Sequence, residues 1–442
     1  MAVSIRACAS VAAMILIAAP RAAEAGAFLN AIQSAGAASV STAGETAIAE
    51  DAATVYYNPA GMTLLDRDQI LAVTPGIFMS QNFKNAGSTT LLGAPVQGSS
   101  GDKRQAFVAP GLFAVMKLSD RVSAGLGLFA PFGQVNSDPN DWVGRYQLQS
   151  ISLKTVDFDP VVAWRVTDSL SLGGGLDIQY AHLVRKNAVD FGSLCVVSVG
   201  AGCSGLGLVP QGADGRQTAT GANWNVGFNL SLLYQLDEST HIGINYRSAV
   251  SHDLSGNARF EVPPAAAPLT AGGLFQYTAA RAGITFPEVV AFGISHKLDE
   301  RLTLLADLDW TGWDRLKQLT IDFANPVQPD QTLNLNWSSS IRGAIGAIYR
   351  LGGDTDLRAG VSYDQTPISR TFRTADLADS DEIMFSAGVT HSFGENISAT
   401  FSYSYGDFAA APMNLTLFGA GTVAGTFHRN TNAIALDTRI GL

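Results

Sequence analysis

Few side chains in this sequence combine a reactive type with a spacing that chemistry needs. Cys195 and Cys203 lie eight residues apart in one Gly-rich segment, which favours a local disulfide in an oxidising compartment. A metal site would need further ligands near them, and the sequence offers none. The six histidines are scattered, and Ser204 lacks the G-x-S-x-G context of a nucleophile elbow. We therefore predict no enzyme activity, no metal and no cofactor.

Two arginines are candidates for binding an anionic ligand. If their segments are strands, the two-residue period turns Arg185 to the same side as Asp177 and Gln179. The same argument turns Arg342 away from Ile341, into the interior. An inward guanidinium suits a carboxylate ligand. The alternative is that each arginine pairs with an inward acid of the protein itself.

The segments that carry these residues alternate apolar and polar side chains. In 397–405, Ile, Ala, Phe, Tyr and Tyr face one side, while Ser, Thr, Ser and Ser face the other. An apolar face backed by a hydroxyl-rich face is typical of a barrel whose outside meets lipid and whose lumen is polar. The alternative is a soluble β-sandwich, but segments of roughly 15 to 20 residues are longer than its usual strands.

Short polar turns, each preceded by an apolar residue, divide the chain into strand pairs. These turns are Ser119-Asp120, Thr167-Asp168, Asp237-Glu238, Asp299-Glu300, Gly352-Gly353-Asp354 and Gly394-Glu395. Outer-membrane barrels have short periplasmic turns and longer extracellular loops. We therefore predict an all-β fold, a 14-stranded antiparallel transmembrane β-barrel over residues 66–442. The long loops are expected near 84–103, 134–145, 188–216, 248–280, 311–333, 366–381 and 406–424.

The first 25 residues are predicted to be a secretory signal peptide. Arg6 supplies the positive charge, 7–19 form a short apolar core, and Ala23-Glu24-Ala25 is a cleavage site. The net charge is -10 and no basic patch interleaves with aromatic residues, so nucleic-acid binding is not expected. Export and barrel strands together predict the outer membrane of a Gram-negative bacterium, in contact with its lipid.

The segment between the leader and the first strand, Gly26–Leu65, is rich in small residues and lacks the alternation. Near its end, Pro59 fixes the backbone and Asn58 can bind local backbone groups, so Asn58-Pro59-Ala60 predicts a rigid turn. A 14-stranded barrel leaves a lumen that side chains cannot fill. We therefore predict that residues 26–65 form a hatch that plugs the lumen. The alternative is an ordinary N-terminal segment.

The third strand is expected to be interrupted. Residues 122–128 alternate regularly and are soon followed by Pro131, Phe132 and Gly133. Pro131 cannot donate to a strand ladder, and Gly133 permits a bend. We predict a kink there, set against the rigid turn Asn58-Pro59-Ala60. The alternative is that the strand simply ends at Pro131.

Together these residues resemble the FadL family of outer-membrane transporters for long-chain fatty acids and other hydrophobic compounds. The matching motifs are Gly26-Ala27-Phe28, Ser34-Ala35-Gly36, Ala47-Ile48-Ala49-Glu50-Asp51-Ala52, Asn58-Pro59-Ala60, Ala130-Pro131-Phe132-Gly133, Trp142-Val143-Gly144-Arg145-Tyr146, Phe286-Pro287-Glu288, Asp309-Trp310-Thr311-Gly312-Trp313 and Asp364-Gln365-Thr366-Pro367. The resemblance departs at the C-terminal Leu442, where such barrels more often end in Phe or Trp. It implies a hatch inside the barrel, an inward kink at Pro131–Gly133 and a gap in the wall beside that kink.

The resemblance also implies a function. It is the passive uptake of long-chain fatty acids or similar hydrophobic molecules, by loop capture, lumenal binding and lateral exit through the gap at the third strand. Lateral exit keeps the apolar surface of the ligand away from water. Phe28 joins Arg185 and Arg342 as a candidate ligand-binding residue, and the protein is expected to act as a monomer. The alternatives are an uptake channel for aromatic hydrocarbons, and a surface adhesin or receptor that uses the barrel as an anchor.

Overall fold

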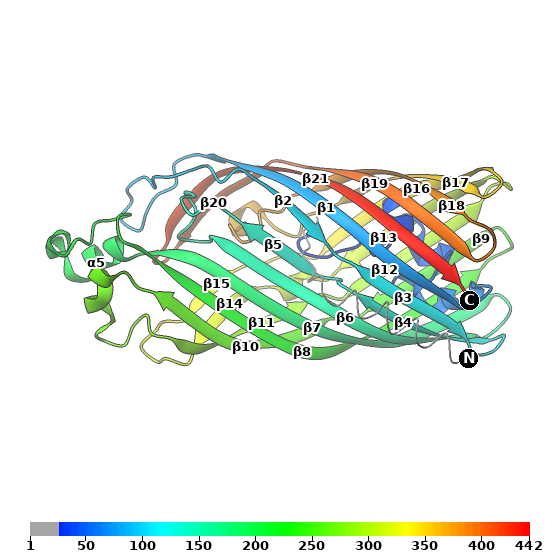
Figure 1. The fold of residues 1–442 in the computed structure, drawn as a ribbon, viewed down its shortest axis with the longest axis horizontal. Helices are drawn as coiled ribbons and strands as arrows, with labels where there is room; N and C mark the ends of the chain where they lie inside the picture. The colour runs from blue at the N-terminus through cyan, green and yellow to red at the C-terminus, as the bar shows by residue number, and fades with distance from the viewer. Residues whose placement is uncertain (1–25) are drawn as a thin grey trace.

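The chain closes into one antiparallel β-barrel of 14 strands, which confirms the fold predicted from the turns. The computed structural model describes residues 26–442, so the predicted signal peptide lies outside the described residues. Figure 1 shows the strands tilted about the long axis, with helix α5 (Phe191–Val199) projecting at one end and the C-terminus at the other. No helix in the described part of the chain is long and apolar enough to cross a membrane.

Several of the 14 strands are divided into two segments by short irregularities. In chain order they are β1 (Gln69–Asn85), β2 with β3 (Lys103–Val108, Gly111–Lys117), β4 with β5 (Val122–Phe129, Gly133–Ser137), β6 (Ser150–Arg165), β7 (Leu170–Asp190), β8 (Asp214–Gln235), β9 with β10 (Thr240–Arg247, Val250–Glu261), β11 with β12 (Thr278–Phe286, Val289–Lys297), β13 with β14 (Leu302–Thr311, Gln318–Phe323), β15 with β16 (Gln331–Asn334, Ser340–Gly352), β17 (Thr355–Asp364), β18 (Glu382–Ser392), β19 with β20 (Ile397–Phe408, Ala411–Leu417) and β21 (Gly421–Gly441). All of the predicted turns connect strands as expected. In one of them the backbone N–H groups of Arg301 and Leu302 donate to Asp299 and hold the pKa of that carboxyl below its usual value.

The predicted alternation decides which side of each strand faces outward. In β19, Phe401 and Tyr403 are 47% and 43% exposed, whereas Ser402 and Ser404 are 1% and 2% exposed. Apolar side chains therefore cover the outside of the barrel and hydroxyl groups line its inside. This arrangement fits a wall between lipid and a polar lumen.

The extracellular loops are shorter than expected, because strands continue into them. Strand β10 occupies part of the predicted loop 248–280, and β14 and β15 form a hairpin inside the predicted loop 311–333. The outward side chains of β10 are polar there, beginning with Ser251 and Asp253. The alternation of apolar outward and polar inward side chains, by which a membrane strand is recognised in the sequence, is therefore absent. The remaining helical turns of this end are η2 (Ala201–Leu206), η3 (Pro264–Thr270), η4 (Trp313–Arg315) and η5 (Arg370–Phe372).

The N-terminal segment, Gly26–Leu65, lies inside the ring of strands (Figure 1). It contains α2 (Ala35–Ser39), α3 (Glu45–Ile48), α4 (Thr54–Tyr57) and η1 (Pro59–Leu64). Helix α2 contacts β18, β19 and β21, helix α3 contacts β9 and β12, and η1 contacts β6, β7 and β8. The segment therefore touches the wall on several sides, and small residues such as Ala35 and Ala47 allow this close packing.

The wall is incomplete at one place. Strand β4 pairs with β6 as far as Phe129, and β5 resumes the pairing with β6 at Gly133, so Ala130–Phe132 interrupt the third strand. Within residues 26–442, β2 pairs only with β1, and β5 pairs only with β6. The facing edges of β2 and β5 therefore lack the backbone ladder that joins other neighbours. The third strand continues past Pro131, so the alternative in which it ends there is wrong.

Candidate functional site

The start of the N-terminal segment binds the backbone at the interruption. Asn30 N–H donates to the Pro131 carbonyl over 2.7 Å, and Gly133 N–H donates to the Phe28 carbonyl over 2.8 Å. From the other side, Phe132 N–H donates to Thr155 Oγ1 over 3.0 Å. The hydrogen-bonding groups released by the break in the strand are thus satisfied by the N-terminal segment and by β6.

The rigid turn at Asn58 lies elsewhere, which corrects our expectation that it faces the kink. Asn58 Nδ2 donates to the carbonyls of Thr46 and Leu232, over 2.6 and 3.0 Å, and Asn58 Oδ1 accepts from Ala60 N–H. Ala60 N–H also donates to Ser231 Oγ over 2.9 Å. Asn58, Pro59 and Ala60 therefore anchor the segment to β8, and Phe28–Asn30 are the residues at the interruption.

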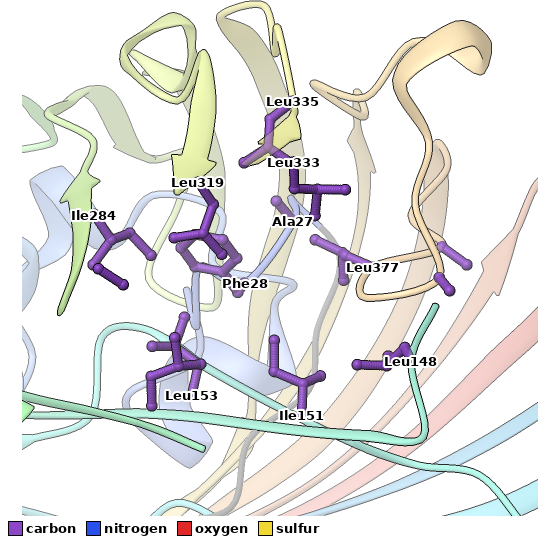
Figure 2. Packing of buried hydrophobic residues seen from close by; sticks show 14 of the residues in the cluster. Ala27, Phe28, Leu148, Ile151, Leu153, Ile284, Leu319, Leu333, Leu335 and Leu377 are labelled. Carbon is purple, nitrogen blue, oxygen red and sulfur yellow. The ribbon is translucent and has the colours of Figure 1, made fainter. Parts of the chain in front are cut away.

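Phe28 lies at the centre of an aromatic cluster beside the interruption. Its ring centroid is 4.8 Å from Trp313, 5.6 Å from Trp337, 5.9 Å from Phe286 and 6.3 Å from Phe132. Most of these rings meet edge to face, the geometry that aromatic pairs prefer. Figure 2 shows Phe28 and Ala27 surrounded by aliphatic side chains from the barrel wall, among them Ile151, Leu153 and Leu319.

A smaller apolar cluster lies at the unpaired edges. Ile77 and Met79 of β1 and Phe107 of β2 are buried together, and Val135 of β5 packs against them. Above this cluster, Lys103 Nζ on β2 forms a salt bridge of 2.6 Å with Asp138, which follows β5. Side chains therefore hold the two edges together where backbone hydrogen bonds do not.

The two candidate arginines both point into the barrel, and each has an acidic partner. Arg185 on β7 forms two hydrogen bonds with Asp376, from Nε over 2.9 Å and from Nη2 over 3.1 Å. Arg342 on β16 lies 3.4 Å from Asp309 and donates from Nη2 to the Ser41 carbonyl over 2.6 Å. Neither arginine is therefore exposed to a ligand without a rearrangement of its present partners.

Besides Asp309, Arg342 binds two residues in a strained part of the N-terminal segment. Ser41 and Thr42 have φ angles of 53° and 60°, in the left-handed region that non-glycine residues rarely adopt. Arg342 binds the carbonyl of the first and Oγ1 of the second. This guanidinium therefore stabilises an unfavourable backbone conformation of the segment.

Asp376 belongs to an inward-folded loop whose burial the sequence did not reveal. The loop 365–381 connects β17 to β18, in agreement with the loop predicted near 366–381, and all of its residues from 373 to 380 are buried. Asp379 within it forms a 2.7 Å salt bridge with Arg429 of β21. The one available signal was the presence of apolar residues, such as Leu377, between the acids of a supposed surface loop.

The cavities beside these groups are small. One of about 60 Å³ lies among Tyr56, Arg247, Trp313 and Arg342, and one of about 20 Å³ lies between β5 and the inward-folded loop. Pockets that enclose drug-sized ligands measure roughly 300–1,000 Å³. A ligand with a long alkyl chain therefore has to displace part of the protein. Farther out, Cys195 and Cys203 are joined by a disulfide at the projecting tip that carries α5.

Comparisons with known proteins agree with this architecture. The family described as "Outer membrane protein transport protein (OMPP1/FadL/TodX)" matches residues 15–440. Putative outer membrane protein NMB0088 of Neisseria meningitidis serogroup B is 29% identical over 379 residues, covering 81% of both chains. The long-chain fatty acid transport protein of Escherichia coli K12 is 25% identical over 383 residues, covering 82% of this chain and 83% of that protein. The crystal structure of a Pseudomonas aeruginosa FadL homologue superposes with a TM-score of 0.85 at 19% identity, covering 94% and 99% of the two chains.

Proposed function

Because this chain belongs to the OMPP1/FadL/TodX family of outer membrane transport proteins, we propose that it takes up long-chain fatty acids or similar hydrophobic molecules passively. The family consists of transporters of hydrophobic compounds rather than enzymes, and the protein is an outer-membrane protein of Gram-negative type. In the proposed route the extracellular loops capture the ligand, the lumen binds it, and it leaves sideways through the wall. The closed barrel acts as a monomer, and Gly26–Leu65 is the hatch that blocks passage to the periplasm.

The observation that supports lateral exit is the pair of unpaired edges on β2 and β5. An apolar cluster of Met79, Phe107 and Val135 lies there, and the Lys103–Asp138 salt bridge also joins the two edges. Separating two strands that share a backbone ladder would expose several unpaired N–H and C=O groups, each costly in a lipid environment. Separating β2 from β5 instead breaks contacts made by side chains, including the Lys103–Asp138 salt bridge and the hydrogen bond from Gln105 to the Ser137 carbonyl. This is therefore a place where the wall can open without the loss of a backbone ladder.

A reversible cross-link between these edges tests the route. Gln105 Nε2 of β2 donates to the Ser137 carbonyl of β5 over 3.3 Å, so the two edges meet here. Cells that lack other fatty-acid transporters would produce the Gln105→Cys, Ser137→Cys variant, and a bis-methanethiosulfonate linker would join the two cysteines. Oleate uptake would be timed after cross-linking and again after a thiol reductant has cleaved the linker. We expect cross-linking to stop most uptake and reduction to restore it.

The two single-cysteine variants are the controls, because reduction also reaches Cys195 and Cys203 in all of these proteins. Mass spectrometry shows how much of the double variant is cross-linked. Normal oleate uptake by fully cross-linked protein would exclude lateral exit. The ligand would then have to pass the N-terminal segment toward the periplasm.

A second candidate substrate is favoured by the aromatic cluster around Phe28. Five rings from the N-terminal segment, the interruption, strand β11 and the loops meet there, and flat apolar ligands stack well on aromatic rings. We therefore infer that uncharged aromatic hydrocarbons are the alternative substrate. Toluene uptake by the same cells, measured beside oleate uptake, distinguishes the two substrates.

A further inference from the structure

Polar contacts hold the inward-folded loop 365–381 against the barrel wall. Arg373 Nη1 donates to the Pro412 carbonyl over 2.7 Å, and Asn136 Nδ2 of β5 donates to the Ala375 carbonyl over 3.4 Å. The salt bridges of Asp376 and Asp379 join the same loop to β7 and β21. The loop is therefore attached to several strands of the wall, including β5 at the unpaired edge.

Two adjacent residues of this loop combine a carboxylate with an apolar side chain. Asp376 offers both oxygens to Arg185, whose side chain is 10% exposed. Leu377, 6% exposed, packs into the same apolar cluster as Phe28. Figure 2 shows Leu377 and Phe28 in this cluster, with Leu148 and Ile151 nearby. A bound alkyl carboxylate would make the same two contacts, because its carboxylate would pair with an arginine and its alkyl chain would lie in the adjoining apolar cluster.

We propose that Asp376 and Leu377 form an internal pseudo-ligand, which occupies the binding site for an alkyl carboxylate until the ligand displaces it. This rests on the proposed function and adds the head-group site and its regulation. The remaining contacts of Arg185 suit this role. Its Nη2 also donates to the Gln147 carbonyl over 2.6 Å, so the guanidinium stays in position when the loop leaves.

Charge explains why the site selects a carboxylate. When the loop leaves, Arg185 loses its counter-ion inside a mostly buried environment, which is strongly unfavourable unless another anion takes its place. A carboxylate restores the two-point pairing, whereas an alcohol or an alkane does not. Arg342 does not fit the same role, because its partners Ser41 and Thr42 belong to the N-terminal segment and remain in place when the loop moves.

Volume explains why the loop has to move. The cavity of about 20 Å³ between the loop and β5 is lined by Gln134, Val135, Leu377 and Arg429. It is too small for an alkyl chain. Removal of Leu377 and its neighbours joins this cavity to the apolar cluster and to the unpaired edge of β5. Displacement of the pseudo-ligand therefore opens the head-group site and the path to the wall at the same time.

The test compares dodecanoate with dodecanol, which share a chain and differ in the head group. Binding to the full-length mature protein in nanodiscs is measured by calorimetry for the wild type, Asp376→Asn, Arg185→Gln and the control Asp322→Asn. Asp322 is an exposed residue of β14, outside the site. Asp376→Asn removes the competing charge and keeps the side-chain shape. We expect it to tighten dodecanoate binding roughly tenfold or more, given the usual strength of buried ion pairs.

The other variants give a distinct pattern. Asp376→Asn also tightens dodecanol binding, since the loop opens more readily, so the preference for dodecanoate persists. Arg185→Gln abolishes that preference, and Asp322→Asn behaves as the wild type. A second measurement uses Leu377→Cys, which is buried when the loop is closed. Dodecanoate should accelerate its reaction with a water-soluble maleimide several-fold more than dodecanol does.

Three results would overturn the proposal. They are unchanged or weaker dodecanoate binding by Asp376→Asn, an undiminished preference for dodecanoate in Arg185→Gln, and Leu377→Cys labelling that is insensitive to dodecanoate. If the wild type binds both ligands and takes up oleate, these results refute the pseudo-ligand alone. If no variant binds either ligand and no uptake occurs, the proposed function fails, and the pseudo-ligand fails with it.

Discussion

The fit of the N-terminal segment in the barrel depends on glycines of the wall, and this predicts how to dislodge it. Gly243 on β9 and Gly360 on β17 present no side chain where the segment touches them. A Cβ atom on Gly243 would lie 2.6 Å from the carbonyl carbon of Thr46, and one on Gly360 would lie 2.7 Å from Cα of Val40. Gly243→Ala and Gly360→Ala therefore push directly against the backbone of the segment.

The size of the effect follows from these contacts. A real Cβ atom essentially never approaches another atom closer than 3.0 Å, and here the obstructing atoms are backbone rather than the end of a flexible side chain. Overpacking of this kind costs about 1–3 kcal/mol. Because the strands are held by ladders on both sides, we expect the segment to yield first. Each variant should raise the population with a displaced segment roughly 5- to 150-fold.

Single-channel conductance in planar bilayers measures that population, because a displaced segment leaves a water-filled lumen. Gly343→Ala on β16 is the matched control, since its Cβ atom would meet nothing within 4 Å. We expect frequent large openings for Gly243→Ala and Gly360→Ala, more for the double variant, and few for the wild type and Gly343→Ala. Equal conductance for all of these proteins, with folded barrels by gel mobility, would refute the idea of a tightly fitted plug.

Two further predictions concern other sites. Intact-mass measurement of protein taken from the membrane should show Cys195 and Cys203 protected from alkylation until reduction, and free thiols before reduction would contradict this pairing. Arg342→Ala should lower oleate uptake and alkane uptake by the same factor, and it should also lower the melting temperature. The reason is that the substitution leaves Asp309 unpaired and releases the strained Ser41 and Thr42. Breaking a buried ion pair on one side costs roughly 3–5 kcal/mol. A loss confined to oleate would instead assign Arg342 to the ligand head group.

The periodic features of this fold could be predicted from the sequence, because they repeat along the chain. Alternation in segments such as 397–405 and turns such as Asp299-Glu300 depend on neighbouring residues only, and they led to the strand number and to the outward face. The interruption at Pro131 was predictable for the same reason, since the effect of proline on a ladder is local.

Contacts across the lumen could not be predicted in this way. Strand parity turned Arg185 and Arg342 inward, but parity does not say which residue on the far side reaches them. The partners proved to be Asp376, from a loop, and Ser41, from the N-terminal segment. The loop between β17 and β18 was predicted near 366–381, but its burial could not be predicted, because it depends on contacts with distant residues such as Arg185 and Arg429.

The seam between the first and last strands has a consequence for assembly. Strand β1 pairs with β21 along its whole length, from Gln69 with Gly441 to Asn85 with Gly425, so the ring cannot close until the end of the chain has been delivered. The N-terminal segment leads directly into β1 and touches strands all around the ring. It is therefore already tethered at the nascent ring when the seam closes. This covalent tether, and not affinity alone, supplies each finished barrel with one N-terminal segment of its own.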